Sequence, residues 1–214
     1  MKAGLLNIVA ALFLVSCGGV DSSQSYDHEG AKSEGGTRGL ETPVVSGVYN
    51  IDTAETVVKW EGTTLTGNHH GVVIVTSGAI TIEGGVVKFA DVVIDLTTIT
   101  EKDVDAEQAI KLVKLLKSPD FFNVEKYPTA TIFITNVEAG AVEADFTIKG
   151  KTKSIMFPAE IVVSEKAVTV VAKLSINRTD FGIVYGSVNY FTDLSKDKII
   201  NDEINFDVSL AASK

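Results

Sequence analysis

Two adjacent histidines, His69 and His70, are the side chains of this sequence best suited to bind a transition metal. Imidazole nitrogen is a preferred ligand of zinc and of related metals. The pair borders a predicted strand, and adjacent side chains on a strand point to opposite faces. Two histidines on opposite faces cannot easily hold one ion, so we predict no metal site.

Three carboxylates, Asp103, Asp105 and Glu107, have the alternate spacing with which a calcium-binding loop begins. Such a loop needs glycine at its sixth position, and this sequence has Gln108 there. Acidic side chains also favour the first turn of a helix, because they complement the helix dipole. We therefore interpret these residues as a helix start.

Asp91 and Asp95 share one face of a predicted strand, an arrangement that could pair two carboxylates for acid–base catalysis. Positions on the solvent-facing outer wall explain the two aspartates better. The sequence has no Ser–His–acid arrangement, glycine-rich phosphate loop or dinucleotide fingerprint. We expect no catalytic residues, no enzymatic activity and no cofactor. An enzyme acting on a small molecule would require a convergent polar cluster inside the fold.

The single cysteine, Cys17, follows a short apolar run. Lys2 supplies positive charge at the start, residues 5–15 are mostly apolar, and small residues surround the cysteine in Leu14-Val15-Ser16-Cys17-Gly18-Gly19. This order resembles a bacterial lipoprotein signal, in which the cysteine is lipidated and becomes the first residue of the mature chain. The apolar run has about half the length that a membrane-spanning helix needs.

We therefore expect residues 1–17 to be a lipoprotein signal peptide with its lipobox, with an ordinary secretory leader as the alternative. The protein would then lie in the cell envelope, anchored to a membrane through Cys17 and facing the periplasm or the exterior. The net charge of -9, without a basic block, argues against nucleic acid as a partner, because phosphate neutralisation needs clustered Lys and Arg. The sequence leaves open whether the protein forms a homodimer.

The elements that would position these residues begin after a polar segment. Residues 18–47 are rich in Gly, Ser, Thr, Asp and Glu and cannot bury enough surface to offset their ordering entropy, so we expect a flexible tether. Residues 48–214 form the predicted domain. Its dominant period is two, as in Val142, Ala144, Phe146 and Ile148, which is typical of half-buried strands.

Short turn signals separate these strands, and they allow only antiparallel neighbours. We expect about eight strands, near 57–66, 70–83, 86–96, 130–138, 141–149, 153–163, 167–177 and 203–212. Several span about ten residues, or roughly 33 Å, a length that suits the tilted strands of a barrel. The fold class is all-β.

One helix interrupts this pattern. Asp105 can accept hydrogen bonds as its N-cap, and Ala109, Leu112, Val113 and Leu116 form one apolar stripe. Pro119 follows its end. The helix is too short to stand alone, so its stripe must cover the sheet or one end of a barrel.

Five stretches of the domain carry a family resemblance. They are Tyr49-Asn50-Ile51-Asp52, residues 116–130 with Asp120-Phe121-Phe122 and Tyr127-Pro128, residues 146–153, residues 176–182, and Asp202-Glu203-Ile204. Together they resemble the YceI-like, lipocalin-like family of exported isoprenoid-binding proteins. The resemblance implies an eight-stranded antiparallel barrel with one short capping helix, and an interior that holds an apolar chain such as a polyprenyl or isoprenoid quinone lipid.

On this basis we expect an extracytoplasmic protein that carries or sequesters such a lipid. The helix and residues 120–128 would form one end and guard the entrance. The interior side chains predicted to bind the lipid are Trp60, Phe133, Phe146, Leu174, Ile176 and Phe206. The direction of Phe133 is open, since Ile132 and Ile134 are also apolar. The alternative is a non-enzymatic interaction or stress protein whose barrel is filled by its own side chains.

Basic residues could meet the polar head of a lipid at the rim. Lys149, Lys151 and Lys153 crowd one turn, and Arg178 ends a strand. A phosphate or a quinone oxygen would suit them, whereas a solvated, charged hairpin explains the lysines without a ligand.

Overall fold

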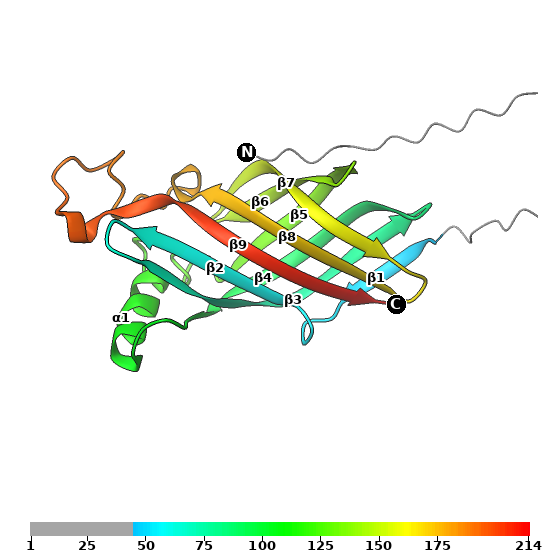
Figure 1. Ribbon diagram of the computed structural model, residues 1–214, viewed down its shortest axis with the longest axis horizontal. Helices are drawn as coiled ribbons and strands as arrows, with labels where there is room; N and C mark the ends of the chain where they lie inside the picture. The colour runs from blue at the N-terminus through cyan, green and yellow to red at the C-terminus, as the bar shows by residue number, and fades with distance from the viewer. Residues whose placement is uncertain (1–44) are drawn as a thin grey trace, which may run out of the picture. The chain divides into compact units, whose positions relative to one another are not determined.

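Residues 45–214, which the computed structural model describes, form a closed antiparallel β-barrel with one helix at one end (Figure 1). The predicted signal peptide, Cys17 and most of the predicted tether lie outside the described residues. The barrel confirms the all-β fold class and its eight strand positions. Within this part of the chain, no helix is long and apolar enough to cross a membrane.

The barrel has nine strands but eight strand positions, because two short strands, β1 and β2, occupy one position in succession. The strands are β1 Gly47–Ile51, β2 Val57–Thr64, β3 Asn68–Glu83, β4 Val86–Glu101, β5 Thr129–Glu138, β6 Ala141–Ile148, β7 Lys151–Val163, β8 Ala167–Asn177 and β9 Ile200–Ser213. Both β1 and β2 pair antiparallel with β3 on one side and β9 on the other. They therefore follow each other end to end between the same two neighbours.

A turn separates β1 from β2. Asp52 Oδ1 accepts hydrogen bonds from the backbone nitrogens of Ala54 at 3.0 Å and Glu55 at 3.3 Å. This Asx turn competes with the ladder for backbone groups and interrupts the strand. The sequence analysis did not predict β1, whose five residues are too few to show a period.

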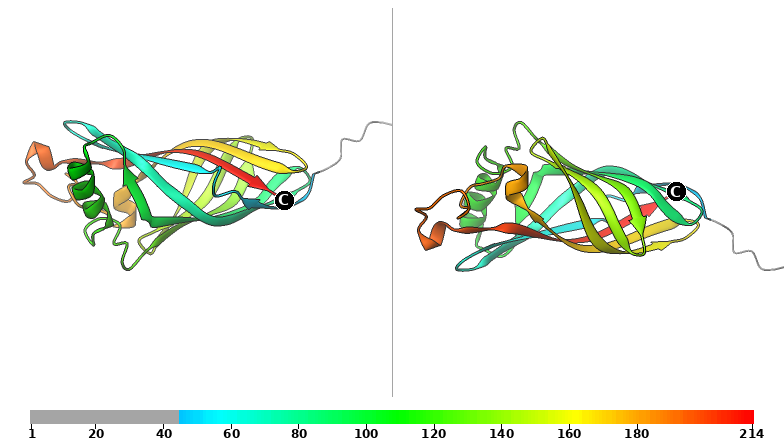
Figure 2. Two further views of the ribbon diagram at one scale, coloured as in Figure 1. Left: turned by 90° about the horizontal axis from the view of Figure 1, so that it is seen from below. Right: turned by 90° about the horizontal axis from the view of Figure 1, so that it is seen from above.

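The remaining strands follow one another around the barrel in the order β2, β9, β8, β7, β6, β5, β4, and the β3–β4 pairing closes the sheet. β4 runs to Glu101, five residues beyond its predicted end. Side chains alternate as predicted: Val142, Ala144, Phe146 and Ile148 of β6 are all buried. Figure 2 shows the strands crossing the barrel obliquely from two sides.

Helix α1, Ala106–Lys117, covers one end of the barrel (Figures 1 and 2). Asp105 is its N-cap and accepts from the backbone nitrogens of Glu107 and Gln108, each at 3.0 Å. The helix-start interpretation is thus confirmed. Lys117 Nζ donates to the carbonyl oxygen of Thr97 at 2.6 Å, which ties the last turn to β4.

The end opposite α1, where β1 lies in Figure 1, is filled by side chains. Tyr49 and Ile51 of β1 are buried together with Ile80 and Ile82 of β3. The hydroxyl of Tyr49 donates to the carbonyl oxygen of Ser164 at 2.8 Å. A closed, packed end leaves the α1 end as the side from which the interior can be reached.

Candidate functional site

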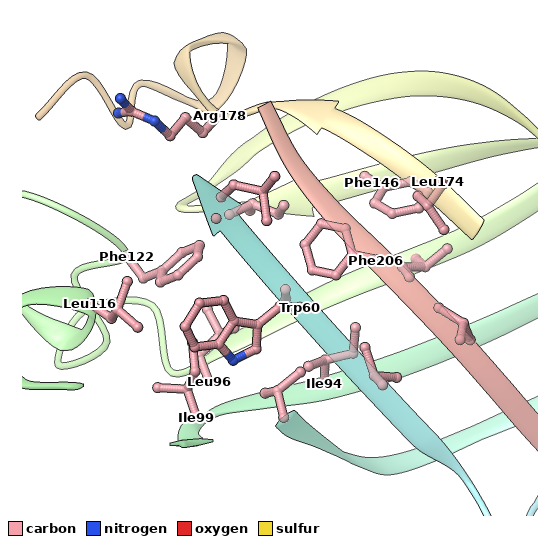
Figure 3. A pocket seen from close by; sticks show the side chains of 18 of the residues that line it. Trp60, Ile94, Leu96, Ile99, Leu116, Phe122, Phe146, Leu174, Arg178 and Phe206 are labelled. Carbon is pink, nitrogen blue, oxygen red and sulfur yellow. The ribbon is translucent and has the colours of Figure 1, made fainter. Parts of the chain in front are cut away.

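A cavity of about 160 Å³ lies inside the barrel, between the packed end and α1. Its wall is almost wholly apolar and draws on strands from around the barrel, as Figure 3 shows for Trp60, Ile94, Phe146 and Phe206. A barrel of eight strands is just wide enough to hold one slender ligand or to be filled by side chains. The interior at this level is hollow, unlike the filled barrel of the alternative reading.

Small residues on the inner face explain the space. Ala130, Ala172 and Gly62 form part of the wall, each where a larger side chain would project inward. A Cβ added at Gly62 would meet no atom within 4 Å. Aromatic side chains elsewhere on the wall do not reach far enough to fill this room.

Four of the six predicted interior residues lie on this wall: Trp60, Phe146, Leu174 and Phe206. They come from β2, β6, β8 and β9, and Figure 3 shows all four. Ile176 is buried, with 3% of its surface exposed, but it is not part of the cavity wall. Whether the four bind a lipid stays a prediction.

The interior placement of Phe133 is wrong. Phe133 is 48% exposed on the outer face of β5 and stacks against Phe89 of β4, with ring centroids 6.4 Å apart and planes at 19°. Its neighbours Ile132 and Ile134 face the cavity instead. All three residues are apolar, so periodicity did not show which face is inward.

The cover of the cavity consists of the last turns of α1 and the segment that follows it. Leu112, Leu115 and Leu116 contribute to the wall with Phe121 and Phe122, whose rings pack edge to face with centroids 5.1 Å apart. Figure 3 shows Leu116 and Phe122 facing Trp60. This agrees with the prediction that the helix and residues 120–128 form one end of the barrel.

The segment after α1 is held by hydrogen bonds to its own backbone and by one lysine. Asn123 adopts a positive φ of 52°, and its backbone nitrogen donates to the carbonyl oxygen of Ser118 at 2.8 Å. Lys149 Nζ donates to the carbonyl oxygen of Pro119 at 2.9 Å. Desolvation lowers the pKa of Lys149, and the negative charge of Asp120 partly offsets this.

Arg178 is fully buried and serves the fold. Its guanidinium donates to the carbonyl oxygens of Ile183 at 2.7 Å, Ile200 at 2.8 Å and Asn201 at 3.0 Å, and Nη2 lies 3.2 Å from Asp202 Oδ1. Burial lowers the pKa of Arg178 while Asp202 opposes the shift. These contacts join the 3-10 helix η1, Arg178–Phe181, to the start of β9. Arg178 also borders the cavity, but each of its three guanidinium nitrogens already donates to a backbone carbonyl oxygen.

The sequence analysis did not predict which polar side chains lie at the mouth of the cavity. Thr63, His69 and Asn201 border the cavity near the tip of β2 and β3, and Asn201 Nδ2 donates to Thr63 Oγ1 at 2.7 Å. The sequence separates Thr63 and Asn201 by 138 residues, so no local pattern could unite them. Asp91 is exposed and Asp95 accepts from Thr97 N at 2.8 Å, which leaves the carboxylate pair outside the cavity.

Known proteins share this architecture. A sequence model of the YceI-like domain matches residues 49–212. The crystal structure of BcnA from Burkholderia cenocepacia is similar to the chain, with a TM-score of 0.60 at 19% sequence identity, covering 76% of this chain and 99% of the other. A polyisoprenoid-binding domain from Saccharophagus degradans has a TM-score of 0.56 at 15% identity, covering 77% and 97%. At these identities the likeness shows the fold. No curated protein sequence matches the chain.

Proposed function

Because the chain belongs to the family of YceI-like domains, we propose that it is a non-enzymatic protein that carries or sequesters an apolar, isoprenoid-like lipid inside its barrel. The observation that carries the proposal is the hollow, apolar interior beneath α1. The fold of the Saccharophagus degradans polyisoprenoid-binding domain supports the choice of a prenyl chain.

The wall selects for an uncharged chain. The aromatic and aliphatic side chains that dominate it offer no partner to a charged or strongly polar group, and burying such a group unpaired is costly. Burial of an apolar chain gains about 0.8 kcal/mol per methylene. Ten methylene equivalents thus supply about 8 kcal/mol, the binding free energy of about a 1 μM complex, before the cost of immobilising the ligand is subtracted.

The size of the cavity limits what it encloses. One water needs about 10–15 Å³ of such space, so the cavity of about 160 Å³ corresponds to roughly 11–16 waters. At about 30 Å³ of liquid per water, this is roughly 330–480 Å³, in the lower part of the range of ligand pockets. A short prenyl chain or one end of a longer chain fits. The rest of a longer lipid would extend past the mouth.

Movement of the cover would widen the entrance for a long chain. Phe121 and Phe122 lie across the α1 end, and the segment between α1 and β5 has no ladder bonds along most of its length. We propose that this segment opens, while α1 stays attached to β4 through Lys117. The polar head of the lipid would then lie near Thr63 and Asn201.

The export signal read from residues 1–17 completes the proposal. Lipidation of Cys17 would hold the barrel at a membrane of the cell envelope, close to a supply of apolar lipid. A single acyl chain gives only marginal membrane binding, so stable attachment would require a second acyl chain or another membrane-binding signal.

The test uses the one tryptophan of the chain, Trp60, as a reporter of the cavity. The full chain is freed of lipid and titrated with geranylgeraniol while the emission of Trp60 is recorded. We expect a saturable change at about one ligand per barrel. Ala172→Phe, which projects a ring into the cavity, should weaken binding at least about tenfold, or 1.4 kcal/mol. Val171 points outward from the same strand, so the Val171→Phe variant should bind geranylgeraniol as the original chain does.

Circular dichroism and thermal melting show whether each variant is folded. If Ala172→Phe fails to fold, Ala172→Leu provides the same test with a smaller side chain. Unsaturable titration of the original chain, or equal binding by the folded Ala172 and Val171 variants, would contradict the proposal.

A further inference from the structure

Three metal-ligating side chains meet at the mouth of the barrel, on the inner face of β3 and at the end of β4. The register brings them together: Gly71 pairs with Trp60 on one side and with Glu101 on the other. Side chains two residues apart on a strand share a face. His69, two residues before Gly71, therefore faces the same side as Glu101, and it borders the cavity. His70 faces the opposite side of β3, although its Nδ1 still lies 3.9 Å from Oδ2 of Asp103 and its backbone nitrogen donates to Asp103 Oδ1 at 3.5 Å.

Asp103 completes the group just beyond the end of β4. Its Oδ1 lies 3.6 Å from His69 Nδ1, too far for a direct hydrogen bond of normal length. One ligand atom from each of His69, Glu101 and Asp103 lies within 4.8 Å of the others. Ligand atoms around a tetrahedral zinc ion at about 2.1 Å are separated by about 3.4 Å, so small side-chain rotations would bring the three into range.

Two buried atoms of this group have no partner among residues 45–214. Glu101 is only 9% exposed. Its Oε1 accepts from the backbone nitrogens of Lys102 at 2.9 Å and Asp103 at 3.0 Å, whereas Oε2 accepts from none of the described groups. His69 Nδ1 is likewise buried and unpaired there. Buried polar atoms in folded proteins almost always have a partner, and a carboxylate oxygen beside an imidazole nitrogen is a pair that one cation can satisfy.

We propose that His69, Glu101 and Asp103 bind one divalent transition-metal ion of the zinc type. Imidazole nitrogen with two carboxylate oxygens suits zinc and its first-row neighbours, whereas calcium prefers oxygen ligands alone. Three protein ligands leave a further coordination position open. Because His69 lines the cavity, that position faces the mouth, where an oxygen atom of water or of a lipid head can reach it.

This site differs from the metal site rejected in the sequence analysis, which would have used His69 and His70 together. The structure replaces His70 with two acidic residues more than 30 positions away. The backbone fixes one of them firmly, since the two amide nitrogens that bind Glu101 Oε1 orient its carboxylate. The competing account is an ordered water that satisfies the same atoms without any ion.

The experiment measures zinc binding to the full chain after removal of metal with a chelator. Isothermal titration calorimetry gives stoichiometry and affinity, and Co²⁺ provides a second probe through its absorption spectrum, which is intense for four ligands and weak for six. Trp60 reports locally, because its indole Nε1 donates to the carbonyl oxygen of Thr100 at 3.2 Å, next to Glu101. Paramagnetic Co²⁺ at the site should quench its emission.

Three variants distinguish the proposed metal ligands His69 and Glu101 from the adjacent His70. His69→Gln and Glu101→Gln should each weaken zinc binding at least about tenfold and abolish the quenching by Co²⁺. Glu101→Gln retains an acceptor for the two backbone nitrogens, and His69 is only partly buried, so at least one variant should remain folded. His70→Gln changes the adjacent histidine, which contacts Asp103 only at 3.9 Å from the other face, so it should weaken zinc binding much less than His69→Gln and should preserve the quenching by Co²⁺.

Zinc binding that saturates at one equivalent and is lost in the His69 and Glu101 variants supports the site. Absence of zinc binding to the original chain would overturn the proposal in favour of water. Binding that survives in both folded variants, without quenching of Trp60, would place the metal elsewhere in the chain and would also overturn it.

Discussion

The indole of Trp60 lies over the bare backbone of Gly71. The two residues pair across β2 and β3, and Trp60 Nε1 donates to the carbonyl oxygen of Thr100 on the far side of Gly71, at 3.2 Å. A Cβ on Gly71 would lie 1.7 Å from that oxygen and 2.9 Å from Nε1. The missing side chain thus allows the largest aromatic residue of the wall to cross its neighbouring strand.

Gly71→Ala should therefore be strongly destabilising. The new methyl group cannot avoid a backbone oxygen, so the β3–β4 pairing or the Trp60 position must shift, and overpacking of this kind costs about 1–3 kcal/mol or more. Urea unfolding followed by circular dichroism measures the loss. Gly62→Ala is the matched control, because its Cβ would meet nothing within 4 Å. Equal stability of the two variants would contradict this reading of Gly71.

The two phenylalanines predicted for the interior should now behave differently. Phe146 is buried and packs edge to face on Phe157, with ring centroids 6.0 Å apart, so Phe146→Ala should cost about 3–5 kcal/mol. Phe133→Ala removes only the outer contact with Phe89 and should cost about 0.5–1.5 kcal/mol. Denaturant midpoints test the difference. A larger loss at Phe133 would mean that this residue faces inward after all.

Removal of the buried cation should destabilise far more than removal of an exposed one. Arg178→Met leaves three carbonyl oxygens without their donor and Asp202 without its counter-charge, a loss of about 3–5 kcal/mol. Lys173 pairs with Asp207 at 3.6 Å on the surface, and Lys173→Met should cost less than about 1 kcal/mol. Thermal melting compares the two. Similar melting temperatures would show that Arg178 does not anchor the segment before β9.

Cys17→Ser should change where the protein is found. Without the thiol no lipid can be attached, so the variant should leave the membrane fraction of the native host and lose incorporation of labelled fatty acid. Ser16→Ala keeps the cysteine and serves as the control. A Cys17→Ser chain that stays in the membrane fraction would show that attachment does not depend on this residue.

Much of the fold follows from local sequence, because alternation along β6, β8 and β9 records which side chains face the core. The N-cap role of Asp105 is equally predictable, since an N-cap needs only its own side chain and the next few backbone nitrogens. β1 escaped prediction because it is stabilised by pairing with residues 79–82 and 212–213. Its five residues contain no signal for such distant partners.

The site was only partly predictable for the same reason. The period of two placed Trp60, Phe146, Leu174 and Phe206 on the inner wall, but it could not orient Phe133 within three consecutive apolar residues. Nor could it relate His69 to Glu101, because their proximity depends on the β3–β4 register. The volume of the cavity depends on how small and large inner residues meet across the barrel, which no single strand reveals.

The most direct test of the hollow barrel is to identify what it contains. The protein purified from its native host is extracted with organic solvent, and mass spectrometry counts the lipid recovered per chain, with Ala172→Phe processed in parallel. We predict about one apolar, prenyl-like molecule per barrel from the original chain and little from the variant. Repeated preparations that yield no such molecule, or the same amount from both proteins, would contradict the account.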